Sequence, residues 1–131
     1  MQKGQITFDF IFALVVFLTI SGLLFSFSKD FKASQQNVLA KIESERISAD
    51  AASAAIYSKV IPVDYFSYFY TIPPMNATGS SGTYPCTLTA APGILTVSVD
   101  SGKIESVFSS PLLDTSLNGK NCGDQINLVK T

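Results

Sequence analysis

The sequence predicts an α+β protein in which a long N-terminal α-helix is followed by a small antiparallel β-sheet head, and three observations support this fold class. Residues 10–28 form a run of nineteen uncharged, mostly apolar residues before the cation at Lys29. A helical pattern without proline or glycine then continues to about Lys59. Beyond Cys86 the apolar residues recur at every second position, which is typical of strands.

The apolar segment 10–28 is long enough to cross a bilayer. At about 1.5 Å per residue it extends roughly 28 Å, close to the roughly 30 Å thickness of the hydrocarbon layer. It is apolar on every side, whereas the surface helix of a soluble protein has a polar face. A secretory signal peptide has a shorter apolar region that ends in a small-x-small cleavage site, and no such site follows residue 28. The alternative interpretation is a plain signal anchor.

The residues before the apolar segment form a distinctive pattern. A basic residue and a glycine precede a glutamine, and hydroxyl, acidic and aromatic residues follow at short intervals. These residues are Lys3, Gly4, Gln5, Thr7, Asp9 and Phe10. With this pattern the chain resembles an archaeal type IV pilin precursor with a class III signal peptide. The resemblance covers about ten residues and the adjoining apolar segment. Thr7 and Asp9 stand where the family usually has serine and glutamate, so the chemistry is kept but the carboxylate is one methylene shorter.

The resemblance implies a processing site. Cleavage after Gly4 by a prepilin peptidase would remove residues 1–4 as a leader and leave Gln5 as the first residue. Gly4 suits such a site because it has no side chain to obstruct a narrow cleft.

Asp9 carries a charge at the rim of the apolar segment. A carboxylate costs roughly 2.5–3.5 kcal/mol at the centre of a bilayer and less near its surface, so it is retained mainly where a partner compensates it. Cleavage would create an α-amino group on Gln5, one helical turn away. The resemblance implies that Asp9 pairs with this cation on its own subunit or on a neighbour, and that Thr7 and Phe10 belong to the same assembly region. The alternative is a snorkelling carboxylate or one favoured by the helix macrodipole.

The charges on the two sides of the apolar segment do not decide its orientation, because Lys3 lies on one side and Lys29 and Lys32 on the other. The resemblance places Lys3 and Gly4 in the cytoplasm and the residues beyond Lys29 outside the cell. It also implies the partners. These are membrane lipid and the prepilin peptidase for the precursor, an assembly ATPase with its membrane platform, and other copies of the chain in a helical filament at the cell surface.

The segment 29–61 predicts an amphipathic continuation of the helix. Its apolar or small residues recur mostly at steps of three, four or seven. This predicted stripe consists of Phe31, Val38, Ile42, Ala49, Ala52, Ile56 and Val60. Together with the segment 5–28 it gives a helix of roughly 50 residues, which needs neighbours to be stable. The small residues of 48–55 allow another backbone to approach closely, and the candidates are the chain's own head and a neighbouring subunit.

Residues 62–131 are expected to form a β-rich extracellular head. Pro62 ends the helix because it lacks an amide donor. Residues 64–70 hold five aromatic rings, which we expect to fill the junction between helix and head. An aromatic ligand-binding patch is the alternative. Pro73-Pro74 and the glycine- and serine-rich run 79–82 predict a loop.

A β-hairpin is predicted further along the head. Residues 95–99 and 104–108 alternate between apolar and polar side chains, and Asp100-Ser101-Gly102 lies between them as a turn. Residues 87–89 and 126–129 are weaker strand candidates.

The chain has two cysteines, Cys86 and Cys122. On the exterior side of a membrane such a pair favours a disulfide over free thiols. The bond would close a loop of about 37 residues and contribute roughly 4 kcal/mol in the chain-entropy model. A head of about 70 residues has a limited core and would benefit from it. A metal site is not expected, because the chain has no histidine and no C-x-x-C spacing.

Asn76-Ala77-Thr78 is a glycosylation sequon with Asn76 as the acceptor, in agreement with exterior placement. We expect no enzymatic activity and no cofactor, because no nucleophilic, metal-assisted or phosphate-binding pattern occurs in the sequence. We also expect no nucleic-acid binding, because net charge is −1 and the residues beyond position 60 include three lysines against five acidic residues.

The sequence therefore predicts a structural subunit of an extracellular type IV pilus-like filament. The subunit would be inserted in the membrane as a precursor, cleaved after Gly4 and polymerised through its hydrophobic helix. The alternatives are an uncleaved, membrane-anchored surface binding domain and a minor or priming pilin.

Overall fold

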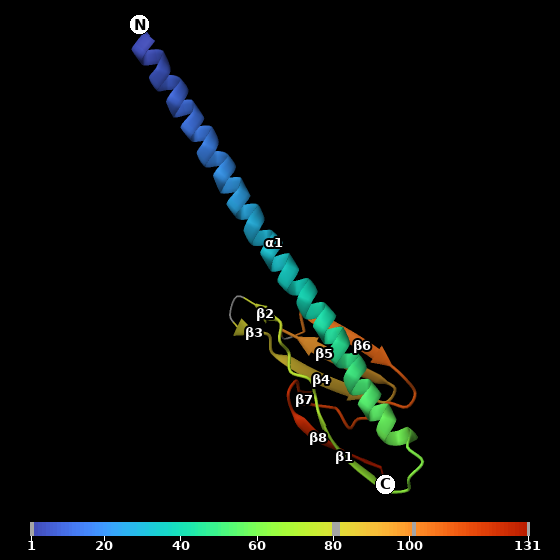
Figure 1. Ribbon diagram of the computed structural model, residues 1–131. Helices are drawn as coiled ribbons and strands as arrows, with labels where there is room; N and C mark the ends of the chain where they lie inside the picture. The colour runs from blue at the N-terminus through green and yellow to red at the C-terminus, as the bar shows by residue number, and fades with distance from the viewer. Residues whose placement is uncertain (1, 80–81, 101, 131) are drawn as a thin grey trace. The chain divides into compact units, whose positions relative to one another are not determined.

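The computed structural model describes the backbone of residues 2–79, 82–100 and 102–130, and the side chains of the same ranges from Thr7 onward. The described chain contains one helix and eight strands. Their bounds are Gln2–Val60 for α1, Phe66–Thr71 for β1, Thr78–Gly79 for β2, Gly82–Thr83 for β3, Cys86–Ala91 for β4, Ile94–Val99 for β5, Ile104–Ser109 for β6, Lys120–Asn121 for β7 and Gln125–Lys130 for β8. The predicted α+β class, with a long N-terminal helix before a small antiparallel head, is confirmed (Figure 1).

The chain divides into two compact units, Met1–Gln35 and Gln36–Thr131. The first unit is the N-terminal part of α1. Within its apolar segment the Thr19 hydroxyl donates to the Val16 carbonyl at 2.8 Å, so the helix itself satisfies this polar group. Where the apolar segment ends, the Lys29 ammonium lies 4.7 Å from the centre of the Phe25 ring, a cation–π contact.

In the second unit α1 ends at Val60, two residues before Pro62, as the sequence predicts. The Ile61 amide still donates to the Tyr57 carbonyl at 3.3 Å, and Pro62 has no amide with which to continue the ladder. The Lys130 ammonium donates to the Ile61 carbonyl at 2.6 Å. A cation at this end of a helix is favourable because carbonyl groups there lack helical partners.

The largest sheet has four antiparallel strands in the order β6-β5-β4-β7. The predicted hairpin is confirmed, because β5 pairs with β6 from Val99 opposite Ile104 to Ile94 opposite Ser109. At the turn between them Asp100 and Gly102 have φ of 52° and 89°, a left-handed conformation that these residue types tolerate best. The weaker strand candidates 87–89 and 126–129 lie within β4 and β8 and are also confirmed.

The aromatic segment 64–70 differs from the prediction. Most of it belongs to strand β1, which pairs with β8 from Phe66 opposite Lys130 to Thr71 opposite Gln125. Tyr70 is buried, whereas Tyr68 and Phe69 are exposed, so only part of the segment fills the junction with the helix. The reason is that aromatic residues favour strands, whose side chains alternate between two faces.

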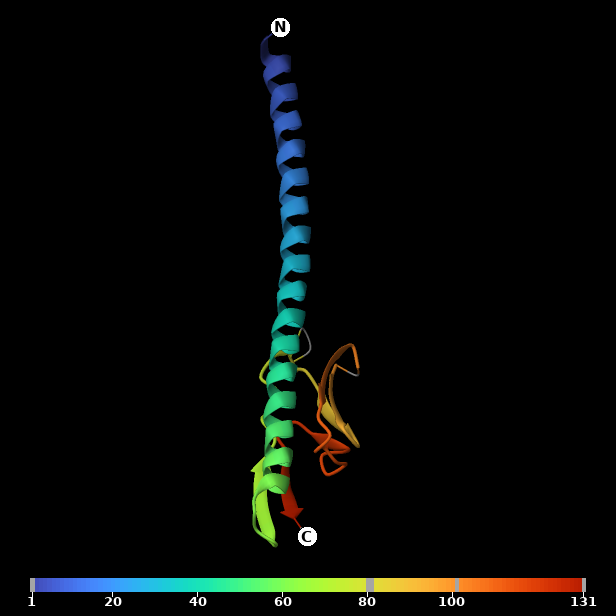
Figure 2. The ribbon, with the colours of Figure 1, turned by 90° about the vertical axis from the view of Figure 1, so that its right-hand side faces the viewer.

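The core of the second unit lies between the C-terminal part of α1 and the sheets. In both views the strands β4, β5 and β6 lie along this part of the helix, and β1 and β8 lie near its C-terminal end (Figures 1 and 2). The helix contributes mostly small residues to the core and the strands contribute larger aliphatic ones. The core includes Ile47, Ala51, Ala52, Ala55, Ile72, Leu88, Leu95, Val97, Val99, Leu117, Ile126 and Leu128.

Most residues of the stripe predicted for 29–61 do not form the face that packs on the sheet of the second unit. Val38, Ile42, Ala49 and Val60 are exposed, Ile56 is half-buried and Ala52 is buried. The face that packs on the sheet is instead formed by small residues and Ile47, with Ser44, Ser48, Ala51 and Ala55 among them. Small residues let the helix backbone approach the sheet, so the large aliphatic residues remain on the outer face. Of the small residues of 48–55, the head covers Ser48, Ala51, Ala52 and Ala55, whereas Ala49 and Ser53 remain exposed.

Candidate functional site

The first unit presents an apolar helix surface that the chain leaves exposed. Its large apolar side chains are Phe8, Phe10, Ile11, Phe12, Leu14, Val15, Val16, Phe17, Leu18, Ile20, Leu23, Leu24, Phe25, Phe27 and Phe31, all of them exposed. Among the described residues one helix is long and apolar enough to cross a membrane, and the first unit contains its apolar part. Contiguous apolar surface on this scale is rare on soluble monomers and marks contact with lipid or protein.

The predicted processing residues lie at the start of this helix. The backbone of Gly4 and Gln5 belongs to α1. Both residues precede Thr7, where the described side chains begin. Cleavage after Gly4 therefore stays a prediction.

The predicted assembly residues Thr7, Asp9 and Phe10 lie in one stretch of the helix and all three are exposed. Among the residues whose side chains are described, no cation pairs with the Asp9 carboxylate. The partner expected from the sequence, the α-amino group of Gln5, exists only in a cleaved chain. The structure thus places a carboxylate next to apolar rings and leaves it exposed.

Polar side chains on α1 fix the second unit's helix to its sheet. The Ser44 and Ser106 hydroxyls are both buried and lie 2.6 Å apart. The Lys41 ammonium donates to the Glu105 carbonyl and lies 3.4 Å from the Ser106 hydroxyl. Because buried hydroxyls are costly unless they are hydrogen-bonded, this contact defines one position of the helix against β6.

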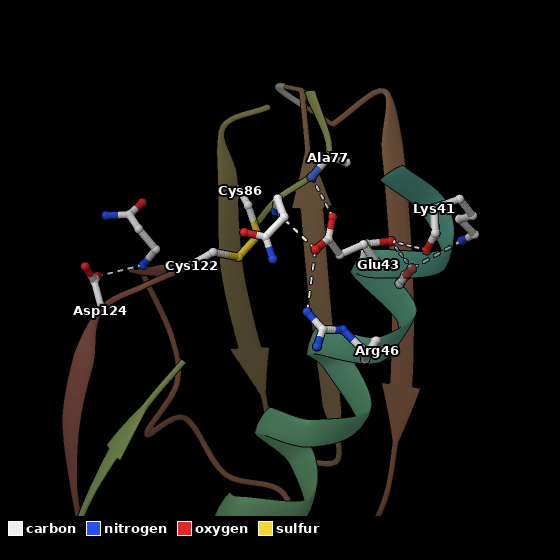
Figure 3. Close-up of a disulfide and its surroundings, with 11 residues drawn as sticks. Lys41, Glu43, Arg46, Ala77, Cys86, Cys122 and Asp124 are labelled. Atoms are coloured by element: carbon white, nitrogen blue, oxygen red, sulfur yellow. Dashed lines mark hydrogen bonds and ion pairs between the residues drawn. A yellow bond between two sulfur atoms is a disulfide. The ribbon is translucent and has the colours of Figure 1, made fainter. Parts of the chain in front are cut away.

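Glu43 holds the loop that carries the predicted glycosylation sequon. Its carboxylate accepts hydrogen bonds from the backbone amides of Asn76 at 3.1 Å and Ala77 at 2.6 Å, and lies 3.5 Å from the Arg46 guanidinium. Figure 3 shows the Glu43 side chain between Ala77 and Arg46. The side chain of Glu43 is only 16% exposed. Sequence reasoning missed this role, because nothing in a local pattern links position 43 to a loop more than thirty residues later.

Asn76 itself lies outside any strand and its residue is exposed, as an acceptor site requires. The Asn76 backbone amide donates to Glu43, and the residue remains exposed. Modification of this residue stays a prediction.

The predicted disulfide between Cys86 and Cys122 is present. The Cα atoms lie 5.4 Å apart, and the Cys122 amide donates to the Cys86 carbonyl at 3.1 Å. The bond joins the start of β4 to the turn after the short strand β7 (Figure 3). Within the described ranges no group of three or more His, Cys, Asp and Glu side chains could hold a metal ion.

A scan against protein-family models, a search of the curated proteins and a search of the solved structures each give no match to the chain. The function proposed below therefore rests on the residues and contacts of the chain itself.

Proposed function

We propose that the chain is a structural subunit of an extracellular, type IV pilus-like filament, made as a membrane-inserted precursor and cleaved after Gly4. The observation that carries this proposal is the exposed apolar surface of the first unit of α1, which lies beside the Gly4-Gln5 pair and Asp9 in the sequence. The precursor would bury this surface in lipid, and the filament would bury it against the same segment of other copies.

The distribution of buried residues along α1 supports separate roles for its two parts. Among the described residues the buried side chains begin at Ala40, and the large apolar side chains of the first unit are all exposed. A helix whose apolar side chains are all exposed must find cover outside its own chain, because about 25 cal/mol is lost for each Å² of apolar surface left in water.

The outer face of α1 in the second unit extends the surface available to neighbours. Val38, Leu39 and Ile42 are each more than half exposed although they lie on the same helix as the packed residues Ala40 and Ser44. We assign this face to contacts between subunits, where the large aliphatic residues would pack against neighbouring helices.

The charge of Asp9 would fix the position of each subunit in the filament. An uncompensated carboxylate among apolar helices is unfavourable, whereas one paired with the α-amino group of Gln5 is neutral as a pair. A subunit would enter the filament in the position that brings these two groups together, and this sets its axial register.

Two measurements test the proposal. Intact mass and peptide mapping of the protein from cells should show a chain that starts at Gln5, with a free or cyclised amine. Electron microscopy of material sheared from the cell surface should show filaments that contain the protein. An intact Met1 together with an absence of filaments would instead establish an uncleaved, membrane-anchored surface domain.

A further inference from the structure

A hollow lined by three tyrosines lies between α1 and β1, entirely within the second unit. Its volume is about 380 Å³, near the lower end of the range for small-molecule sites. The helix contributes Asp50, Ser53, Ala54 and Tyr57, and β1 contributes Tyr68 and Tyr70. We call this the tyrosine hollow. The sequence near the aromatic segment shows no set of polar groups that would converge on a ligand together with its rings. The fold brings Asp50 and Ser53 of α1 next to these rings.

Asp50 gives the tyrosine hollow a negative charge. One of its carboxylate oxygens accepts a hydrogen bond from the Tyr70 hydroxyl at 2.8 Å. Within the described part of the chain no basic side chain pairs with Asp50, and the basic residues nearest in sequence, Arg46 and Lys59, pair with Glu43 and Asp114. The second carboxylate oxygen is therefore available to a ligand.

The Tyr70 hydroxyl stays protonated and keeps the Asp50 carboxylate in place. Burial, together with the hydrogen bond and charge of Asp50, raises the pKa of Tyr70 far above its ordinary value. The Tyr70 hydroxyl therefore remains a hydrogen-bond donor to the Asp50 carboxylate.

Aromatic rings surround this charge. The Tyr68 and Tyr70 ring centres lie 6.5 Å apart, and Phe66 continues the row at 6.1 Å from Tyr68. Tyr57 and Tyr68 are 62% and 41% exposed, so their rings are open to a ligand. Aromatic rings attract cations through their negative faces, and groups of such rings recognise quaternary ammonium ligands.

We propose that the tyrosine hollow binds the ammonium group of a small organic cation. Asp50 would supply the compensating charge, and Tyr57, Tyr68 and Tyr70 would supply the ring surface. A neutral sugar is a poorer match for the charge of Asp50. The lining side chains include no N–H donor, and the Ser53 hydroxyl already donates to the Ala49 carbonyl at 2.7 Å. This site does not depend on filament assembly, since every lining residue belongs to one chain.

The test is a titration of the full-length chain in a polyoxyethylene detergent, which has neither a choline nor a sugar headgroup. The chain has five tyrosines, so ring-labelled tyrosine gives few NMR signals that single substitutions can assign. Choline is added up to roughly 100 mM, about a hundredfold above a millimolar dissociation constant. The rings of Tyr57, Tyr68 and Tyr70 should shift with saturation, and those of Tyr65 and Tyr84 should not.

Matched probes and variants test whether the site recognises the positive charge of the ligand and whether the tyrosine rings contribute to binding. The neutral isostere 3,3-dimethyl-1-butanol should bind at least roughly tenfold more weakly than choline. Tyr57→Leu should weaken choline binding roughly two- to fivefold, and Asp50→Asn should weaken it while keeping an acceptor for Tyr70. Tyr65→Leu, an exposed tyrosine outside the tyrosine hollow, should leave affinity unchanged.

Three results would overturn the proposal. The first is an absence of saturable shifts for Tyr57, Tyr68 and Tyr70 at the highest choline concentration. The second is equal affinity for choline and its neutral isostere. The third is a response to glucose without one to choline. An unchanged Tyr84 signal in each variant verifies that the head is still folded.

Discussion

The Lys59 ammonium lies 3.0 Å from the Asp114 carboxylate, which joins the last turn of α1 to the segment after β6. The amide of Ser116 donates to the same carboxylate at 2.9 Å. Burial by itself raises the pKa of Asp114, but the hydrogen bonds from Ser116 and the contact with Lys59 outweigh it and hold the pKa below its usual value. The charged form of Asp114 therefore stabilises the folded head.

This contact predicts a pH-dependent loss of stability. A carboxyl group whose pKa is lower in the folded state stabilises the fold above its unfolded pKa, and this contribution disappears as pH falls through the folded pKa. We expect Asp114→Asn to lower the melting temperature at about pH 7 and to have little effect at about pH 2. The loss should not exceed about 1 kcal/mol, because both side chains are more than a third exposed. Lys59→Met should give a similar loss at the higher pH, and equal losses for Asp114→Asn at both values would contradict the assignment.

Removal of the Glu43 carboxylate should destabilise the head. Glu43→Ala leaves the amides of Asn76 and Ala77 without their charged acceptor, and we expect the free energy of unfolding to fall by about 1.5–3 kcal/mol. Chemical denaturation followed by near-ultraviolet circular dichroism of the tyrosines measures this. Glu45→Ala is the matched control, because Glu45 is 59% exposed and pairs with Lys41 at 3.7 Å. If both variants lost the same stability, the bonds to the loop would contribute nothing specific.

The disulfide should contribute more than any single polar contact. Replacement of Cys86 and Cys122 together by serine should lower the free energy of unfolding by about 2–4 kcal/mol. Dithiothreitol should destabilise the wild type by a similar amount and leave the double variant unaffected. A wild type that unfolds at the same denaturant concentration with and without reductant would show that the bond does not form in the isolated protein.

Replacement of Asp9 should separate membrane insertion from assembly. Asp9→Ala removes the charge that we expect to pair with the α-amino group of Gln5, so the precursor should insert normally and filament yield should fall strongly. Asp30→Ala is a control for the loss of one acidic residue, because Asp30 lies beyond the apolar segment. Filaments as abundant as those of the wild type would rule out the pairing mechanism.

A bulky residue at position 4 should trap the precursor. Gly4→Leu is expected to block cleavage, so the protein should retain its first four residues in intact mass spectra. Gly22→Ala is a matched change in the same helix, where an added methyl group has open space, and it should be cleaved normally. Normal processing of Gly4→Leu would place the cleavage site elsewhere.

The elements with a local signal could be predicted from the sequence. The β5–β6 hairpin follows from strict alternation around a turn with Asp100 and Gly102, and the helix end follows from the missing amide of Pro62. The chain has two cysteines and so allows one internal pairing, and the expected exterior placement favours the bond between Cys86 and Cys122. Strand β1 has no such local signal, because its partner β8 lies more than fifty residues away and its aromatic residues fit a packed junction as well as a strand.

The packed face of the helix could not be predicted from hydrophobicity. In segment 29–61 the large aliphatic residues recur most clearly at helical spacing. The sheet nevertheless packs mainly against alanines and serines, because small side chains let the helix backbone approach it closely. The same limit applies to the polar contacts. Glu43 with the 76–77 loop and Asp50 with Tyr70 join residues far apart in sequence, and only the folded chain brings them together.

The serines on the packed face have a mechanical consequence. Ser44, Ser48 and Ser58 each donate to a carbonyl three residues earlier in the helix, so these three donated bonds hold the helix together and do not join it to the sheet. Resistance to shear then falls on contacts spread along the helix, which include Ser44 with Ser106, Asp50 with Tyr70 and Lys59 with Asp114. A displacement by one helical turn would break these contacts together. A pulling force along the helix axis would therefore meet a stiff head that yields abruptly rather than gradually.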